Sequence, residues 1–136
     1  MADAYLRMRG ITKLYPENHV LANHEVDFEV CQNEIHAVVG ENGAGKSTLM
    51  KILYGLERAD RGSIELRDRP VHIGSPLDAS RLGIGMVHQH FRLIPDFTIA
   101  ENVVLGIEPV HCGLFLDREG ARRAVRAVIE EFGFSI

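Results

Sequence analysis

The chain has 136 residues, a net charge of −4 at pH 7, and the hydrophobic and charged fractions of an ordinary globular domain. Its length suits one domain with a real core, and its scattered basic residues do not form the concentrated patch that nucleic-acid binding requires. The two cysteines form no metal-type or redox-type pair, and no apolar run approaches the ~20 residues needed to cross a bilayer. We therefore expect no nucleic-acid partner and no transmembrane segment in this chain.

Strand signals dominate the first third of the chain. Residues 6–11 and 26–30 alternate apolar and polar side chains, which predicts strands with one buried face. Residues 35–39 are more continuously apolar and predict a strand of a parallel sheet that helices cover on both faces. Further along, residues 63–73 predict a hairpin and residues 84–88 another short strand.

Helix signals follow the strands. Residues 47–54 carry apolar side chains at helical spacing. Thr98 is followed three positions later by Glu101, a capping box that starts a second helix. Asp117 is suited to cap a longer helix, and Gly133 to end it. The apolar face of this last helix holds Ala121, Val125, Val128, Ile129 and Phe132.

Residues 40–47, GENGAGKS, fit the phosphate-loop pattern G-x-x-x-x-G-K-[ST] at every fixed position. Glycines allow the tight bend in which backbone N–H groups point at phosphate oxygens, and a helix start adds the positive end of its dipole. Lys46 can reach the outer phosphates, the Ser47 hydroxyl can bind Mg²⁺, and Thr48 adds a further hydroxyl and amide. The predicted nucleotide-binding residues are Gly40, Glu41, Asn42, Gly43, Ala44, Gly45, Lys46, Ser47 and Thr48.

Three stretches together resemble one family. They are GENGAGKSTLMKILYG at 40–55, GIGMVHQHFRLIP at 83–95 with FTIAEN at 97–102, and ITKLYP at 11–16. The first resembles the phosphate loop and helix of the ATP-binding-cassette family, the second its Q-loop region, and the third its segment with an adenine-stacking aromatic. The resemblance covers essentially the whole chain, and the motifs follow the family's order.

The resemblance implies a fold and specific residue roles. It implies an α/β phosphate-loop NTPase core with an antiparallel β subdomain, in which residues 1–96 belong to the nucleotide-binding part and residues 97–136 begin a helical subdomain. Tyr15 would stack on adenine and Val20 would pack near the ribose. Gln89 would bind Mg²⁺ and the attacking water, and Lys46 would act with it in catalysis. The implied cofactors are ATP and Mg²⁺.

Several parts of such a cassette do not occur in these 136 residues: the signature motif, the Mg²⁺-binding Asp, the catalytic Glu and the switch histidine. Residues 114–119 are an apolar run that ends in acidic residues, as does the family's strand with the Mg²⁺-binding Asp and the catalytic Glu. They precede a helix, however, so we interpret Asp117 as a helix cap. We therefore expect a cassette truncated before the signature motif. Such a chain would bind ATP and hydrolyse it poorly, although the full-length protein would be a transport-coupled ATPase.

Within the family, the chain looks most like importers of simple sugars or nucleosides. The implied partners are transmembrane permease subunits, a second nucleotide-binding domain and, indirectly, a substrate-binding protein. Its implied location is the cytoplasmic face of the cell membrane, where it is peripheral and held through the permease. Two alternatives stay open: a soluble, non-transport ATPase of the same type, and a nucleotide-binding module without hydrolysis. A metal site at His88 and His90 is a weaker hypothesis, because no third ligand stands near them in the sequence.

Overall fold

The computed structural model describes residues 4–88, 93–111 and 115–134. The chain divides into two compact units, Met1–Val87 and His88–Ile136. The predicted boundary after residue 96 stays a prediction, because compactness alone does not identify a helical subdomain. Within the described ranges, no helix is both long enough and apolar enough to cross a membrane.

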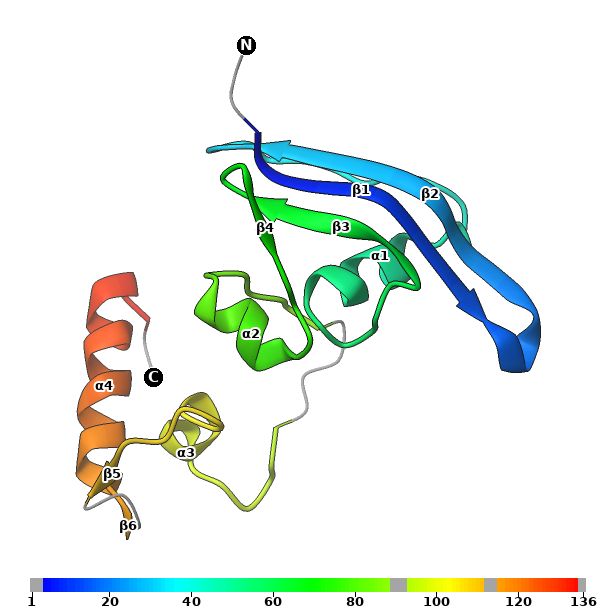
Figure 1. The fold of residues 1–136 in the computed structure, drawn as a ribbon. Coiled ribbons are helices and arrows are strands. Elements are labelled where there is room, and N and C mark those ends of the chain that lie inside the picture. Colours follow the sequence, from blue (N-terminus) through cyan, green and yellow to red (C-terminus); the bar gives the residue numbers. More distant parts are fainter. Residues whose placement is uncertain (1–3, 89–92, 112–114, 135–136) are drawn as a thin grey trace. The chain divides into compact units, whose positions relative to one another are not determined.

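A four-stranded antiparallel sheet forms the framework of the first unit (Figure 1). Its strands, in the order β2-β1-β3-β4, are β1 (Ala4–Tyr15), β2 (Val20–Cys31), β3 (Arg61–Leu66) and β4 (Arg69–Val71). A short 3-10 helix, η1 (Pro16–Asn18), joins β1 to β2. The predicted strands at 6–11 and 26–30 are confirmed but are longer than predicted, and the predicted hairpin is present as β3 and β4.

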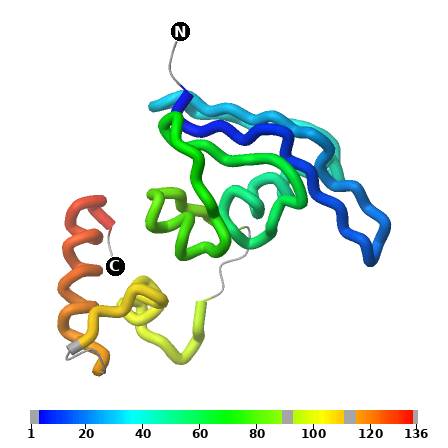
Figure 2. Tube along the Cα trace, viewed as in Figure 1, coloured from blue at the N-terminus to red at the C-terminus, as the bar shows by residue number. Residues whose placement is uncertain are grey.

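The β1–β2 hairpin extends beyond the rest of the sheet. β1 pairs with β3 only from Leu6 to Thr12, whereas its pairing with β2 continues to Tyr15. The last residues of β1 and the first of β2 therefore form a two-stranded arm, drawn in blue in Figure 2. Tyr15 and Val20 are the last pair of this arm.

A β-bulge in β1 explains how one strand buries both an even and an odd position. Met8 pairs with Phe28 and Ile11 with Val26, so three residue steps on β1 match two on β2. The extra residue shifts the alternation of faces by one position. Gly10 lies in the bulge with φ of +58°, a conformation that glycine adopts at low cost. As a result, Met8 and Ile11 both point into the core.

Helix α1 (Lys46–Leu53) packs on this sheet and closes the core of the first unit (Figure 1). Its buried Leu49 and Ile52 cluster with Met8 and Ile11 of β1. Burying a side chain of this size contributes about 1.5–3 kcal/mol. The predicted helix at 47–54 is confirmed, one residue earlier in the chain. The packing of its apolar face holds the start of the helix, and thus the predicted phosphate loop, beside the hairpin.

A short helix, α2 (Pro76–Arg81), is missing from the sequence predictions. Its start signal is nevertheless local. The Ser75 hydroxyl accepts a hydrogen bond from the N–H of Asp78 at 3.3 Å, and Pro76 occupies the first turn. Serine before a helix and proline at its first position are typical of helix starts. The helix was overlooked because it is too short to show an apolar periodicity.

Two predicted strands are wrong. Residues 35–39 and 84–88 form no strand in the structure, and Ile35 and Val39 are 100% and 91% exposed. A strand of a parallel sheet needs neighbouring strands to pair its N–H and C=O groups. In the described part of the chain, no strand pairs with either segment. Apolar character alone therefore does not make these segments strands.

Within its described residues, the second unit contains two helices and a small two-stranded ladder. The elements are α3 (Ile99–Val103), β5 (Val110–His111), β6 (Phe115–Leu116) and α4 (Arg118–Phe132). The predicted caps are confirmed: Thr98 and Glu101 form the capping box of α3, and the Asp117 carboxylate accepts a hydrogen bond from Gly120 N–H at the start of α4. Gly133 ends α4 with φ of +67°. Asp117 is thus a helix cap, as predicted.

The apolar face of α4 is only partly covered by the described part of the second unit. Ala121 and Val125 are buried in a cluster with Val104. Val128 and Phe132, which belong to the same predicted face, are 44% and 65% exposed. The sequence pattern therefore identifies the face correctly and overestimates how much of it this unit buries.

Replacing Glu101 with glutamine should lower the stability of the second unit slightly at neutral pH, and the difference should vanish in acid. The Glu101 carboxylate accepts hydrogen bonds from the N–H and the hydroxyl of Thr98, both at 2.9 Å, and these bonds lower its pKa below 4.5. A pKa that folding depresses adds stability above the unfolded-state pKa, and this stability is lost as the pH falls through the folded-state pKa. Denaturation midpoints at neutral pH and well below pH 4.5 check this, with Glu119→Gln as the control. A difference in denaturation midpoint that persists in acid would contradict this prediction.

Candidate functional site

The predicted phosphate loop lies between the segment after β2 and the start of α1, and it bends tightly. The N–H of Ala44 donates to the carbonyl of Glu41 at 3.2 Å, and Gly43 and Gly45 have φ of +88° and +82°. Only glycine adopts this left-handed backbone readily. Residues 41–44 are exposed, and a helix begins directly after the bend. An exposed glycine-rich bend before a helix start is the arrangement that binds phosphate groups.

Gly45 sits directly against β2 and has no room for a side chain. A Cβ at this position would lie 2.1 Å from the carbonyl oxygen of Ala22 and 2.8 Å from Nδ2 of Asn23. The carbonyl of Gly45 accepts the first helical hydrogen bond of α1, from the N–H of Leu49 at 2.9 Å. Gly45 therefore joins the loop, the helix and the strand at one point. The sequence pattern requires a glycine here but does not show that β2 is the reason.

The ammonium group of Lys46 folds back over the loop that precedes it. Its Nζ donates to the carbonyl oxygens of Gly40 at 2.8 Å and Glu41 at 2.7 Å. An ammonium has three N–H donors, so these two bonds position the charge and leave capacity to bind an anion. Lys46 is the residue of the loop that carries positive charge, and its ammonium lies against the backbone of the loop's first two residues.

The predicted base-binding residues lie on the same hairpin that supports the loop. Tyr15 and Val20 are direct cross-strand partners at the end of the β1–β2 arm. Ala22 and Asn23, which contact Gly45, follow Val20 by two and three positions on β2. One short stretch of strand therefore connects the predicted adenine-binding residues to the predicted phosphate loop.

The predicted metal ligands are only partly described. Ser47 and Thr48 are the second and third residues of α1, with Ser47 exposed and Thr48 half-buried. Gln89 and His90 lie outside the described residues, so the pairing of Ser47 with Gln89 stays a prediction. Over residues 4–88, 93–111 and 115–134, no group of three or more His, Cys, Asp or Glu side chains gathers to hold a metal.

A carboxylate fixes the chain between β2 and the loop. Glu34 accepts a hydrogen bond from the N–H of Cys31 at 2.7 Å and contacts Nδ1 of His36 at 2.8 Å. The Cys31 bond, followed by the His36 contact, lowers the pKa of Glu34 below 4.5. The His36 ring also meets Phe28 edge to face at 5.1 Å between ring centroids. His36 thus contacts Glu34 and Phe28 but is exposed, and its interpretation as a packed polar residue stays a prediction.

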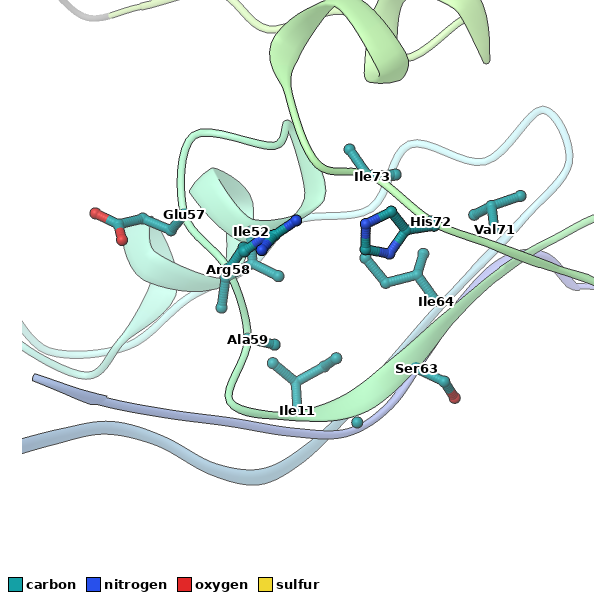
Figure 3. Close-up of a pocket in the computed structure, with 11 residues that line it drawn as sticks. Ile11, Ile52, Glu57, Arg58, Ala59, Ser63, Ile64, Val71, His72 and Ile73 are labelled. Carbon is teal, nitrogen blue, oxygen red and sulfur yellow. The ribbon is translucent and has the colours of Figure 1, made fainter.

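A cavity of about 300 Å³ lies elsewhere in the first unit, between the end of α1, β3 and β4 (Figure 3). Ile11, Ile52 and Ile64 contribute its apolar lining, and Arg58 and His72 are among its polar side chains. It includes no residue of the loop at 40–48 and neither Tyr15 nor Val20. The candidate site is therefore the phosphate loop with the end of the hairpin, and the cavity is separate from it.

The family model for "ABC transporter" matches residues 23–135, so the chain belongs to the ABC transporter family. It is 47% identical to the guanosine import ATP-binding protein NupO of Bacillus subtilis (strain 168), over 96% of this chain and 25% of that protein. It is 48% identical to the ribose import ATP-binding protein RbsA 1 of Rubrobacter xylanophilus, over 96% of this chain and 26% of that protein. The chain thus spans about a quarter of the length of these relatives.

Two solved structures show the same fold. A nucleotide-free ATP-binding cassette from an ABC transporter has a TM-score of 0.67 and 27% identity, over 76% of this chain and 40% of that chain. MJ1267, an ATP-binding cassette of an ABC transporter, has a TM-score of 0.75 and 24% identity, over 95% of this chain and 54% of that chain. The predicted family and the predicted fold class, an α/β phosphate-loop NTPase core with an antiparallel β subdomain, are both confirmed.

Proposed function

We propose that this chain binds ATP, with the phosphates in the loop at 40–48 and the base against Tyr15 and Val20. The observation that carries the proposal is the position of Lys46. Its ammonium is held by the carbonyls of Gly40 and Glu41, the first two residues of a glycine-rich bend that leads into a helix. Calorimetric titration of ATP tests this directly. A chain that gave no saturable heat with ATP would exclude the proposal.

Mg²⁺ fits the same site. The exposed Ser47 lies next to Lys46 at the helix start, and a hydroxyl oxygen suits a hard cation. In this proposal Ser47 and Gln89 would hold the ion, which would supply charge neutralisation on the phosphate oxygens. Lys46 stabilises negative charge on the transferred phosphoryl group, and Gln89 orients the water.

These 136 residues by themselves should bind ATP and turn it over very slowly. The sequence contains Lys46 and the loop, but the family's catalytic Glu does not occur in these 136 residues. Phosphoryl transfer requires an oriented, activated water as well as charge stabilisation. Phosphate release at saturating ATP and Mg²⁺, measured on the same sample as the titration, checks both the binding and the slow turnover. Turnover comparable to that of an intact transporter ATPase would contradict this expectation.

We further propose that the complete protein powers the import of a simple sugar or a nucleoside. The names of the relatives, which refer to guanosine and ribose import, support this class of solute. The proposed partners are membrane permease subunits, a second nucleotide-binding domain and, indirectly, a substrate-binding protein. The protein would be peripheral, at the cytoplasmic face of the membrane. Neighbouring genes for a permease and a substrate-binding protein would support import, and their absence would favour a soluble ATPase of the same family.

A further inference from the structure

Lys13 and Asn23 are direct partners in the β1–β2 ladder, between the Tyr15–Val20 end of the hairpin and the phosphate loop. Directly opposed residues of an antiparallel pair project from the same face of the sheet. We propose that these two are positioning residues that fix Tyr15, the proposed adenine platform, in place relative to the phosphate loop. The inference rests on the proposed ATP site and adds two residues that no motif contains.

Asn23 acts on the phosphate loop. It is only 5% exposed, and it is the one buried polar residue in the described ranges. Its Nδ2 donates to the carbonyl of Gly45 at 3.4 Å, while its Oδ1 has no hydrogen-bond partner within the part of the chain that the structure describes. An unpaired buried oxygen lowers stability, and an apolar side chain of similar size would avoid that cost. Packing alone therefore gives no reason for an asparagine here, whereas its contact with Gly45 does.

Another bulge of the hairpin brings β2 close to the loop. Lys13 pairs with Asn23 and Leu14 with Leu21, so one residue step on β1 matches two on β2. The extra residue is Ala22, whose carbonyl oxygen is the atom that a Cβ on Gly45 would meet at 2.1 Å. Bulges bend a strand and redirect its groups, and they recur next to functional sites. This bulge brings the backbone of Ala22 and the side chain of Asn23 to the same glycine.

Lys13 acts on the aromatic ring. Its Nζ lies 5.3 Å from the centroid of the Tyr15 ring and 3.8 Å from Oδ1 of Asp60, and its side chain is only 14% exposed. The other oxygen of Asp60 accepts a hydrogen bond from the N–H of Leu14 at 2.7 Å. A cation over one face of a ring restricts the orientation of that ring and leaves the opposite face for a flat base. Asp60, just before β3, thereby fixes the arm from outside the hairpin.

The test compares two ligands, ATP and inorganic tripolyphosphate, because the second has no base. Lys13→Met should weaken ATP binding about threefold and leave tripolyphosphate binding unchanged, since it disturbs only the ring. Asn23→Leu should weaken the binding of both ligands by a similar factor, about fivefold, since it disturbs the loop. Lys13→Arg keeps the cation and should restore ATP affinity. The matched controls are Lys51→Met and Gln32→Ala, which alter an exposed lysine of α1 and an exposed carboxamide after β2.

The outcomes separate this inference from the function on which it rests. If the unaltered chain binds neither ligand, the proposed ATP site itself is wrong. If the unaltered chain binds both and the two variants bind them equally well, Lys13 and Asn23 have no positioning role. Thermal melting provides the second readout: Asn23→Leu should match or exceed the unaltered chain in stability, because it removes an unpaired oxygen. A less stable Asn23→Leu would show that Asn23 serves the fold and would overturn its assignment.

Discussion

Lys46→Ala is expected to weaken ATP binding by about a hundredfold, because a hydrogen-bonded charge contributes about 1.5–3 kcal/mol. Its ammonium is held by the carbonyls of Gly40 and Glu41. Removing it deletes the positive charge and also leaves two carbonyl dipoles without their donor. Those carbonyls would then repel phosphate oxygens, so the loss exceeds that of a single contact. Calorimetric titration of both proteins with ATP and Mg²⁺ measures the effect.

The control for this variant is Lys51→Ala, in the last turn of the same helix. Lys51 is exposed and donates no side-chain bond to the loop, as far as the described residues show. Its removal makes the net charge more negative by the same amount, so any general electrostatic effect appears in both variants. Equal affinity of Lys46→Ala and Lys51→Ala would reduce the role of Lys46 to net charge and would contradict its placement in the site. Melting of both variants should change little, because the loop at 41–44 is exposed.

Local signals in the sequence were sufficient for the caps, the turns and the loop. The capping box of α3, the Asp117 cap of α4 and the glycine bend each depend on a few consecutive residues. Such features form wherever the local chemistry favours them. The resemblance to a family rests on three such stretches, and it is confirmed. Each motif can be identified from consecutive residues, and the order of the motifs can be read directly from the sequence.

Local signals were not sufficient for the two predicted strands that the structure lacks. The segments 35–39 and 84–88 have apolar sequences, but a strand also needs partners for its backbone groups. Whether partners exist is a property of the whole sheet, and in the described ranges neither segment has one. The register shifts of the β1–β2 hairpin, among them the bulges at Gly10 and Ala22, are equally invisible to periodicity, because each one interrupts the alternation on which the prediction depends.

The candidate site also combines residues that local signals identify with residues that only long-range contacts reveal. The pattern G-x-x-x-x-G-K-[ST] identified Lys46 and the loop, and the structure places them together. Asn23 was missed because its partner, Gly45, is 22 residues away and its strand was predicted to start only at Val26. A buried asparagine has no sequence signature of its own. Only the contact reveals why an amide side chain stands on that face of β2.

Gly45→Ala is expected to abolish ATP binding and to destabilise the first unit, and Gly43→Ala is its matched control. Both glycines have φ above +80°, so an alanine at either position carries the left-handed strain of roughly 1–2 kcal/mol. The new methyl group meets nothing within 4 Å at Gly43, whereas at Gly45 it would lie 2.1 Å from the backbone of Ala22. Backbone cannot rotate away as a side chain does, so α1 must separate from β2. The buried cluster of Leu49 and Ile52 on β1 would then loosen.

The difference between the two variants isolates the contact of the loop with β2, because the strain is common to both. Thermal melting and ATP titration of the pair should show a large gap, with Gly43→Ala folded and Gly45→Ala largely unfolded or unable to bind. If both variants lose the same modest amount of stability and ATP affinity, the backbone of β2 moves easily at Ala22. In that case the loop would be held only by its own bend and by Lys46. The hairpin would no longer explain how the proposed base and phosphate positions are kept in register.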